Sequence, residues 1–258
     1  MNDSVGLPPH RVAAMVAPAL DRLVVAGMRV FLDGGGAELS QRYGGPAATG
    51  FLVELRTRLA APGGTVDRAG FAAVTRHRDP AACRRALDKH VAYGMVHRRP
   101  DGAISATARG TAFLTEAHQV QGEVTEELWA GHDDRVSRLV EASGRLLAYA
   151  LAGEEPAGGG DPAGGAFAAT APPYEPDGTP PGVLLLNRLA TLRHHRADAH
   201  AAAWTAAGHT AQSVAALPDG PERVAIDLET DRRAAGPYAA LTAGERLDVL
   251  ADLAALPG

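Results

Sequence analysis

The sequence predicts a mainly α-helical fold with one small β-hairpin. Apolar residues recur at helical spacing over most of the chain, and two short strand-forming runs flank a Pro-Asp-Gly turn at 100–102. A stretch at 153–182 interrupts this pattern, since 8 Gly and 7 Pro make up half of its residues. Such a stretch buries too little apolar surface to offset the entropy lost on ordering. We therefore expect a linker at 153–182, between a domain at 1–152 and a helical domain at 183–258.

Composition narrows the class of protein. Of 258 residues, 46% are hydrophobic and 21% are charged, which is typical of a globular protein. The only cysteine, Cys83, excludes an intramolecular disulfide and a cysteine-based zinc cluster, and it fits a reducing compartment. The most apolar stretch, residues 12–32, contains three charged residues, so it predicts neither a secretion signal nor a membrane span. We expect a cytoplasmic protein without membrane association, cofactor or structural metal.

The first elements follow from apolar periodicity. A helical pattern over residues 12–30 ends before the three glycines at 34–36. A second helix is predicted around residues 51–59, where apolar residues are spaced four apart. A short β-leaning run at 65–67 precedes another helical segment at 69–75.

Clearer signals mark the next helix and the hairpin. Asp79 is a favourable N-cap residue, and Pro80 fits the first helical position, so a helix should run to about Tyr93. Gly94 ends it. Strands at 95–98 and 103–106 follow, joined by the turn at 100–102. Helix, helix, hairpin is the order of a winged helix-turn-helix, which we assign to residues 46–115.

Charge is unevenly distributed along the chain. Residues 68–99 contain eight basic and two acidic residues, a charge of +6, whereas the whole chain carries −5 and the remainder therefore −11. A basic module of this kind suits DNA, because contacts to phosphates release counterions. The helical projection puts Arg84, Arg85, Asp88 and Lys89 on one face. We predict DNA contacts from Arg76, Arg78, Arg84, Arg85, Lys89, Arg98 and Arg99.

Two alternatives to this interpretation remain open. The charges could only solvate an exposed helix, or the winged helix could be a protein-interaction module that binds no DNA. Cys83 lies among the arginines, so its thiol is either an oxidation switch or, as we favour, an inert small residue.

The stretch Ala86–Gly102, followed by Thr107-Ala108-Arg109-Gly110, resembles the MarR-like winged-helix regulators over about 70 residues. In that family the recognition helix ends at a glycine, a Gly-Leu-Val-x-Arg strand follows, and a Thr-x-x-Gly opens the next helix. The resemblance implies a ligand-responsive transcriptional regulator that binds duplex DNA as a homodimer through flanking helices. Two departures are the greater length of this chain and the residues Asp79-Pro80-Ala81, where the family often has Ser or Thr; no DNA-sequence preference is carried over.

Further helices are predicted at 111–129 and 135–152, and a C-terminal bundle of helices at 183–208, 221–235 and 242–256. The phrases at 192–200 and 237–241 resemble C-terminal extensions of actinobacterial members of the same family.

Arg196 and His200 fall on the apolar face of the first C-terminal helix, where an unpaired charge is costly. The pair therefore needs a partner. One alternative is an acid of the next helix, and the other is a small anionic effector, whose carboxylate suits the planar guanidinium. The acids considered are Asp227, Glu229 and Asp231.

Metal-binding and enzymatic functions are less favoured. His194 and Asp198 are spaced as metal ligands on a helix but do not converge with His200, which lies on the opposite face. The glycines after Asp33 fit no phosphate-binding fingerprint, and the chain contains no Gly-x-Ser-x-Gly motif. We expect no enzymatic activity.

Overall fold

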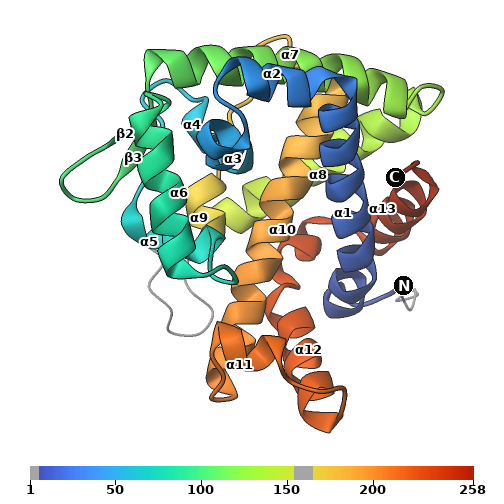
Figure 1. The fold of residues 1–258 in the computed structure, drawn as a ribbon. Coiled ribbons are helices and arrows are strands. Elements are labelled where there is room, and N and C mark those ends of the chain that lie inside the picture. Colours follow the sequence, from blue (N-terminus) through green and yellow to red (C-terminus); the bar gives the residue numbers. More distant parts are fainter. Residues whose placement is uncertain (1–5, 154–164) are drawn as a thin grey trace.

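The computed structural model describes residues 6–153 and 165–258, and it confirms a mainly helical fold with one small sheet (Figure 1). The N-terminal elements are α1 (Pro9–Phe31), η1 (Leu32–Gly36), α2 (Ala37–Arg42), α3 (Pro46–Glu54), α4 (Arg56–Leu59), β1 (Thr65–Val66), α5 (Arg68–Val74), α6 (Pro80–Ala92), β2 (Val96–Arg98), β3 (Ile104–Ala106), α7 (Ala108–Leu128) and α8 (Asp133–Ala152). The C-terminal elements are α9 (Ala166–Thr170), α10 (Pro181–Ala206), α11 (Ala211–Ala215), α12 (Pro221–Arg233), η3 (Gly236–Ala240) and α13 (Ala243–Ala255).

The sheet is antiparallel, with the strand order β1-β3-β2. Ser105 of β3 pairs with Thr65 of β1 on one side and with His97 of β2 on the other. The predicted hairpin is therefore present, and the short run after α4 becomes its third strand. The turn between β2 and β3 closes with a hydrogen bond from the Arg99 amide to the Ala103 carbonyl (2.8 Å).

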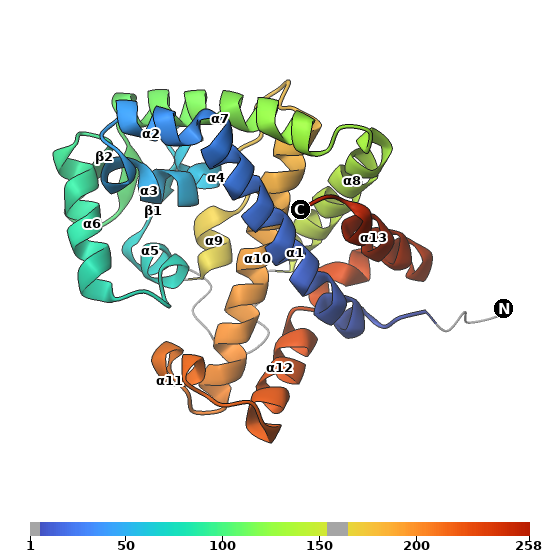
Figure 2. The ribbon, with the colours of Figure 1, turned by 45° about the vertical axis from the view of Figure 1, so that its right-hand side comes forward.

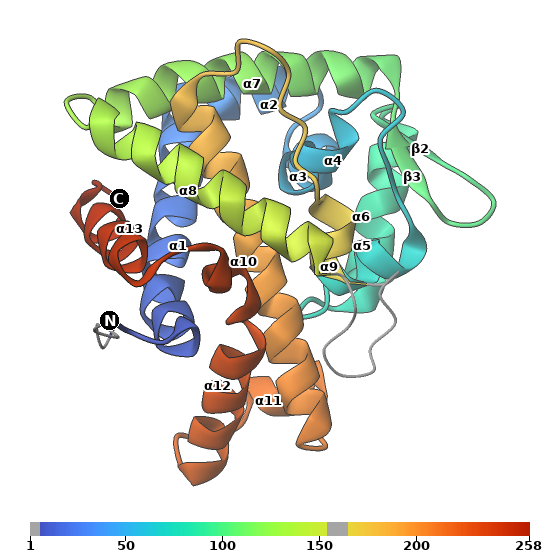
Figure 3. The same cartoon turned by 180° about the vertical axis from the view of Figure 1, so that it is seen from behind.

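Two large hydrophobic clusters form most of the core of the described residues. One lies under α3, α6 and the sheet, and includes Phe51, Leu52, Leu87 and Met95. The other joins α1 and α8 to α10, η3 and α13. Figures 1 and 3 show α10 in the middle of the molecule, with α1 on one side and α8 on the other. No described helix combines the length and apolar character that a membrane crossing needs.

This second cluster contains residues from both sides of the predicted linker at 153–182. The C-terminal helices bury much of their apolar surface against α1 and α8. Among the described residues, only a small cluster of Ala203, Val214 and Ile226 is formed by α10, α11 and α12 alone. Gly27 of α1 marks how closely the helices approach, since a Cβ there would lie 2.6 Å from a methyl carbon of Leu186 on α10. Helices α1 and α8 of the predicted N-terminal domain therefore share a core with the C-terminal helices, across the predicted boundary.

The predicted linker is also partly structured. Residues 154–164 lie outside the described residues, but the part that follows contains α9, which packs between α5 and α10 (Figure 2). Phe167 and Ala169 are buried there. Asp198 of α10 accepts hydrogen bonds from the amides of Ala166 (3.0 Å) and Phe167 (2.8 Å), so it satisfies the first turn of α9. Gly- and Pro-rich composition could not indicate this packing, because the cap comes from a distant helix.

Candidate nucleic-acid interface

The inner face of α6 fixes the helix to α3. Asp79 caps it as predicted, accepting hydrogen bonds from the amides of Ala81 (3.1 Å) and Ala82 (2.9 Å). His90 is buried, and its Nε2 accepts the amide of Phe51 on α3 (3.0 Å). Nδ1 must then carry the proton and donate to the Ala86 carbonyl (2.7 Å). Burial lowers the pKa of His90, which favours the neutral ring that this bridge requires.

Sequence reasoning missed His90, although a signal was available. Cys83, Leu87 and His90 are spaced four and three apart, which places all three on one side of a helix. The structure buries all three, so the thiol of Cys83 lies in the core beneath α6 and not among the exposed arginines.

The opposite face of α6 carries the charges. Arg84, Arg85, Asp88 and Lys89 are exposed, as the helical projection predicts. Arg98 and Arg99 are exposed at the end of β2 and in the turn after it. In Figure 1, α6 and this hairpin lie together at one edge of the molecule, on the side away from α12 and α13. No described element covers α6 at this edge in Figures 1 and 2.

Most of these arginines have exposed acidic neighbours. Arg98 pairs with Asp88 (2.7 Å), and Arg99 lies 3.3 Å from Asp101. Arg85 lies 3.7 Å from Asp79. Exposed pairs of this kind contribute little to stability and are screened by salt, so the guanidinium groups can exchange a carboxylate for a phosphate. Within the described parts of the chain, Arg84 and Lys89 lie within 4.0 Å of no acid.

The face is less basic than the sequence count indicates. The predicted contact residues Arg84, Arg85, Lys89, Arg98 and Arg99 bring five positive charges, and Asp79, Asp88 and Asp101 bring three negative ones, which leaves +2. Arg78 is half exposed and pairs with Glu54 of α3 at 2.8 Å, at the edge of this face.

Arg76 does not belong to the interface. Its side chain is only 14% exposed and turns inward, where the guanidinium pairs with Asp198 of α10 and donates to the Ala197 carbonyl (3.2 Å). It also donates to the Ala73 carbonyl (2.7 Å). Arg76 thus joins the turn between α5 and α6 to α10, and we correct its predicted contact with DNA. The sequence placed it among the arginines near α6, but the carboxylate that binds it lies 122 positions away.

The Thr-x-x-Gly motif positions the hairpin relative to α6. Gly94 ends the helix with a φ of +68°, which favours glycine. Thr107 donates to the Gly94 carbonyl (2.6 Å) and accepts the amide of Gly110 (3.1 Å), so one hydroxyl joins the end of α6 to the start of α7. Gly110 has no room for a side chain, because a Cβ would lie 2.2 Å from the Met95 carbonyl oxygen.

The predicted anion site at Arg196 and His200 is filled by groups of the chain itself. Arg196 pairs with Asp231 of α12 at 2.8 Å, with side chains 26% and 15% exposed. His200 Nδ1 lies 3.0 Å from the Thr230 hydroxyl, and burial lowers its pKa. An internal acid, and not an effector, is therefore the partner of Arg196, and a hydroxyl of the chain is the partner of His200. Glu229, another candidate acid, pairs with Arg232 and Arg233 instead.

His194 and Asp198, which are spaced as metal ligands, also lie against other groups of the chain. Burial and the nearby Arg193 lower the pKa of His194 to about 4, and Asp198 is already bound to Arg76 and to α9. Among the described residues, no group of three or more His, Cys, Asp or Glu is placed to hold a metal ion. Comparison of the whole chain with protein-family models, characterised proteins and solved structures found no match.

Proposed function

We propose that this protein is a DNA-binding transcriptional regulator in which α6 is the recognition helix and the β2–β3 hairpin is the wing. The observation that carries the proposal is the two-sided nature of α6, whose inner face is anchored by buried residues and whose outer face presents exposed cations at the edge of the molecule. The element order α3, β1, α5, α6, β2, β3, with strands in the order β1-β3-β2, supports a winged helix-turn-helix.

On this proposal each basic residue has a defined task. Arg84, with no acid within 4.0 Å among the described residues, is best placed to reach a guanine edge, since α6 fits the major groove. Lys89, further along the same face, and Arg98 and Arg99 at the wing contact phosphates. The exposed ion pairs of the wing open on binding.

The resemblance to MarR-like regulators further predicts a cytoplasmic homodimer. The apolar faces of α1 and α8 are buried within the chain against α10 and α13, so a dimer would have to use other surfaces. Light scattering on the purified protein decides the point: a monomer has a mass of 26.6 kDa, and a homodimer twice that.

The proposal is tested by fluorescence anisotropy with a labelled duplex from the protein's own upstream region and an unrelated duplex of equal length. Affinity should fall steeply between about 50 and 200 mM salt. Arg84→Ala should weaken binding by ~1 to 3 kcal/mol if the side chain contacts a base, and more for the specific duplex than for the unrelated one.

The matched control is Arg11→Ala, which removes the same charge from the exposed first turn of α1, on the far side of the molecule from α6 (Figure 1). It should leave DNA affinity unchanged. If the wild-type protein binds no duplex at low salt but retains a protein partner on the α6 face, the protein-interaction module replaces our proposal.

A further inference from the structure

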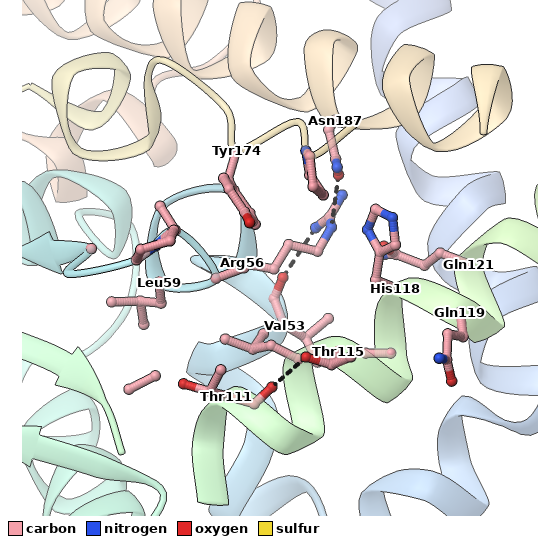
Figure 4. A pocket seen from close by; sticks show the side chains of 18 of the residues that line it. Val53, Arg56, Leu59, Thr111, Thr115, His118, Gln119, Gln121, Tyr174 and Asn187 are labelled. Atoms are coloured by element: carbon pink, nitrogen blue, oxygen red, sulfur yellow. Dashed lines mark hydrogen bonds between the residues drawn. The ribbon is translucent and has the colours of Figure 1, made fainter. Parts of the chain in front are cut away.

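A cavity of about 650 Å³ lies between α4, the loop after it, α7 and α10 (Figure 4). Its volume is in the range of sites that hold small molecules. Much of its lining is apolar, with side chains from α1, α3, α4 and α7, and the segment before α10 closes one side with Tyr174 and Pro176. The main apolar lining residues are Phe31, Val53, Leu59, Pro62, Leu114 and Ala117.

Arg56 brings a positive charge into this cavity. Figure 4 shows its side chain crossing the cavity toward Asn187, with Tyr174 on one side and His118 on the other. Nε donates to Asn187 Oδ1 (3.1 Å), and Nη1 donates to the Val53 carbonyl (3.0 Å). Nη2 donates to no described residue. Two of the five N–H groups are therefore satisfied by protein acceptors, and neither acceptor is charged.

This arginine differs from other inward-facing arginines of the same chain. Arg76, Arg188 and Arg196 each pair with a carboxylate. Arg188 lies one residue after Asn187 and binds Glu175 through two hydrogen bonds (2.8 and 2.6 Å). Arg56 forms no ion pair with any described residue, and burial lowers its pKa to about 10. It stays protonated at neutral pH, so the cavity holds a cation without a counter-charge, which is costly.

The rest of the lining adds polar groups but no charge. Gln119, Gln121 and Asn187 are amides, and Thr111 and Thr115 are hydroxyls. His118 is neutral at pH 7, because burial lowers its pKa. No Asp or Glu belongs to the described residues that line the cavity. Its net charge is therefore +1, next to a wide apolar surface.

We propose that this cavity binds a small organic monocarboxylate, with the carboxylate on the Arg56 guanidinium and the apolar body against the side chains of α4 and α7. The planar guanidinium offers paired N–H donors that match the two carboxylate oxygens. One negative charge balances the +1 of the cavity, and the apolar lining favours a carbon skeleton over an inorganic anion or a phosphate. None of the residues that line this cavity is among those proposed to contact DNA.

The test is isothermal titration calorimetry on the full-length protein with three probes: sodium hexanoate, sodium decanoate and sodium 4-phenylbutyrate. Each is paired with the alcohol of the same skeleton. At least one carboxylate should bind saturably with one site per chain, and its alcohol should bind about tenfold more weakly or worse, since only the acid pairs with Arg56. No saturable binding by any of the three at millimolar concentration overturns the proposal.

Arg56→Met keeps the length of the side chain and removes its charge. It should weaken carboxylate binding by about tenfold or more and leave alcohol binding unchanged. The matched control is Arg58→Met on the same short helix, because Arg58 donates to the Thr65 carbonyl and does not line the cavity. Equal loss in both variants overturns the proposal. If Arg56→Met does not fold, the wild-type comparison still decides, since equal affinity for acid and alcohol excludes a role for the charge.

Discussion

The arginines of the α6 surface and those packed against α10 meet acids in two different ways. At the surface, Arg98 and Asp88 have side chains 41% and 58% exposed, and water competes for both. Around α10, Arg196 and Asp231 have side chains 26% and 15% exposed. The first pair can open without cost to the fold, whereas opening the second strands a buried charge. Exposure, and not residue type, thus decides which arginines are available to an external partner.

Arg56 is an inward-facing arginine that has no acidic partner among the described residues. Like the paired arginines it is partly buried, yet it faces a cavity and its acceptors are neutral. A partly buried charge without an acidic partner lowers stability, and on our proposal it raises affinity for an anion, a compromise that binding sites commonly make.

The largest effect is expected from Arg196→Ala. It leaves Asp231 buried without its partner and should lower the free energy of unfolding by about 3 kcal/mol, at the lower end for a buried pair because both groups keep some exposure. The melting temperature should fall by about 6 to 12 °C, measured by scanning calorimetry. The double variant with Asp231→Ala should recover part of the loss.

The control for this pair is Arg193→Ala. Its partner Asp21 and Arg193 itself are about half exposed, so the change should stay within about 0.5 kcal/mol. A native melting temperature for Arg196→Ala would contradict the structural assignment and return this arginine to the candidate anion sites.

The next effect concerns acid stability. The folded protein holds His194 with a pKa of about 4, against 6.5 when unfolded. Between pH 6.5 and about 4, His194 is protonated in the unfolded chain but largely neutral in the folded protein. The contribution of His194 to the free energy of unfolding is therefore complete above pH 6.5 and is lost as the pH falls toward 4. The loss from this ring approaches about 1.4 kcal/mol per pH unit in that window.

Unfolding by urea at pH 7, 6 and 5 measures this loss. His194→Gln should reduce the slope of the free energy of unfolding against pH by nearly the contribution of one proton. His97→Gln should not change this slope, because His97 is exposed on the hairpin. A wild-type protein equally stable at all three values would show that His194 is accessible to protons in the folded state.

A smaller effect is expected at the wing. Arg98→Ala and Arg99→Ala should each reduce the slope of log affinity against log salt by about 0.9, the share of one phosphate contact. Neither should change the melting temperature by more than the control variants do, because both side chains are about half exposed. Slopes equal to that of the wild type would remove the hairpin from the DNA interface.

The smallest effect is expected from Asp88→Asn. The change removes an exposed carboxylate and releases Arg98, so DNA affinity should rise by about twofold to threefold, with no change in stability. Anisotropy titrations at two salt concentrations measure it. Weaker binding would mean that Asp88 itself contacts DNA, as a carboxylate does when it accepts the amino group of cytosine.

Sequence reasoning worked where the signal and the element lie close together in the chain. The N-cap at Asp79 and the end of α6 at Gly94 were predicted from neighbouring residues, and the structure has both. The outer face of α6 followed from helical periodicity. Of the candidate sites, Arg76 was wrong because its partner is distant in sequence, and the cavity around Arg56 was missed because its walls come from several separated segments.

By itself the sequence determined most of the helices and strands, though not α2, α9 and α11, and the side of α6 that faces water. These depend on capping, turns and periodicity, which act over about four residues. Only the tertiary structure decided that the C-terminal helices share a core with α1 and α8, and which arginines are paired. Arg196 finds Asp231 across 35 positions, and Arg56 finds an amide instead of an acid across 131. Local patterns carry no information about such distant partners, so the availability of each charge is a property of the fold.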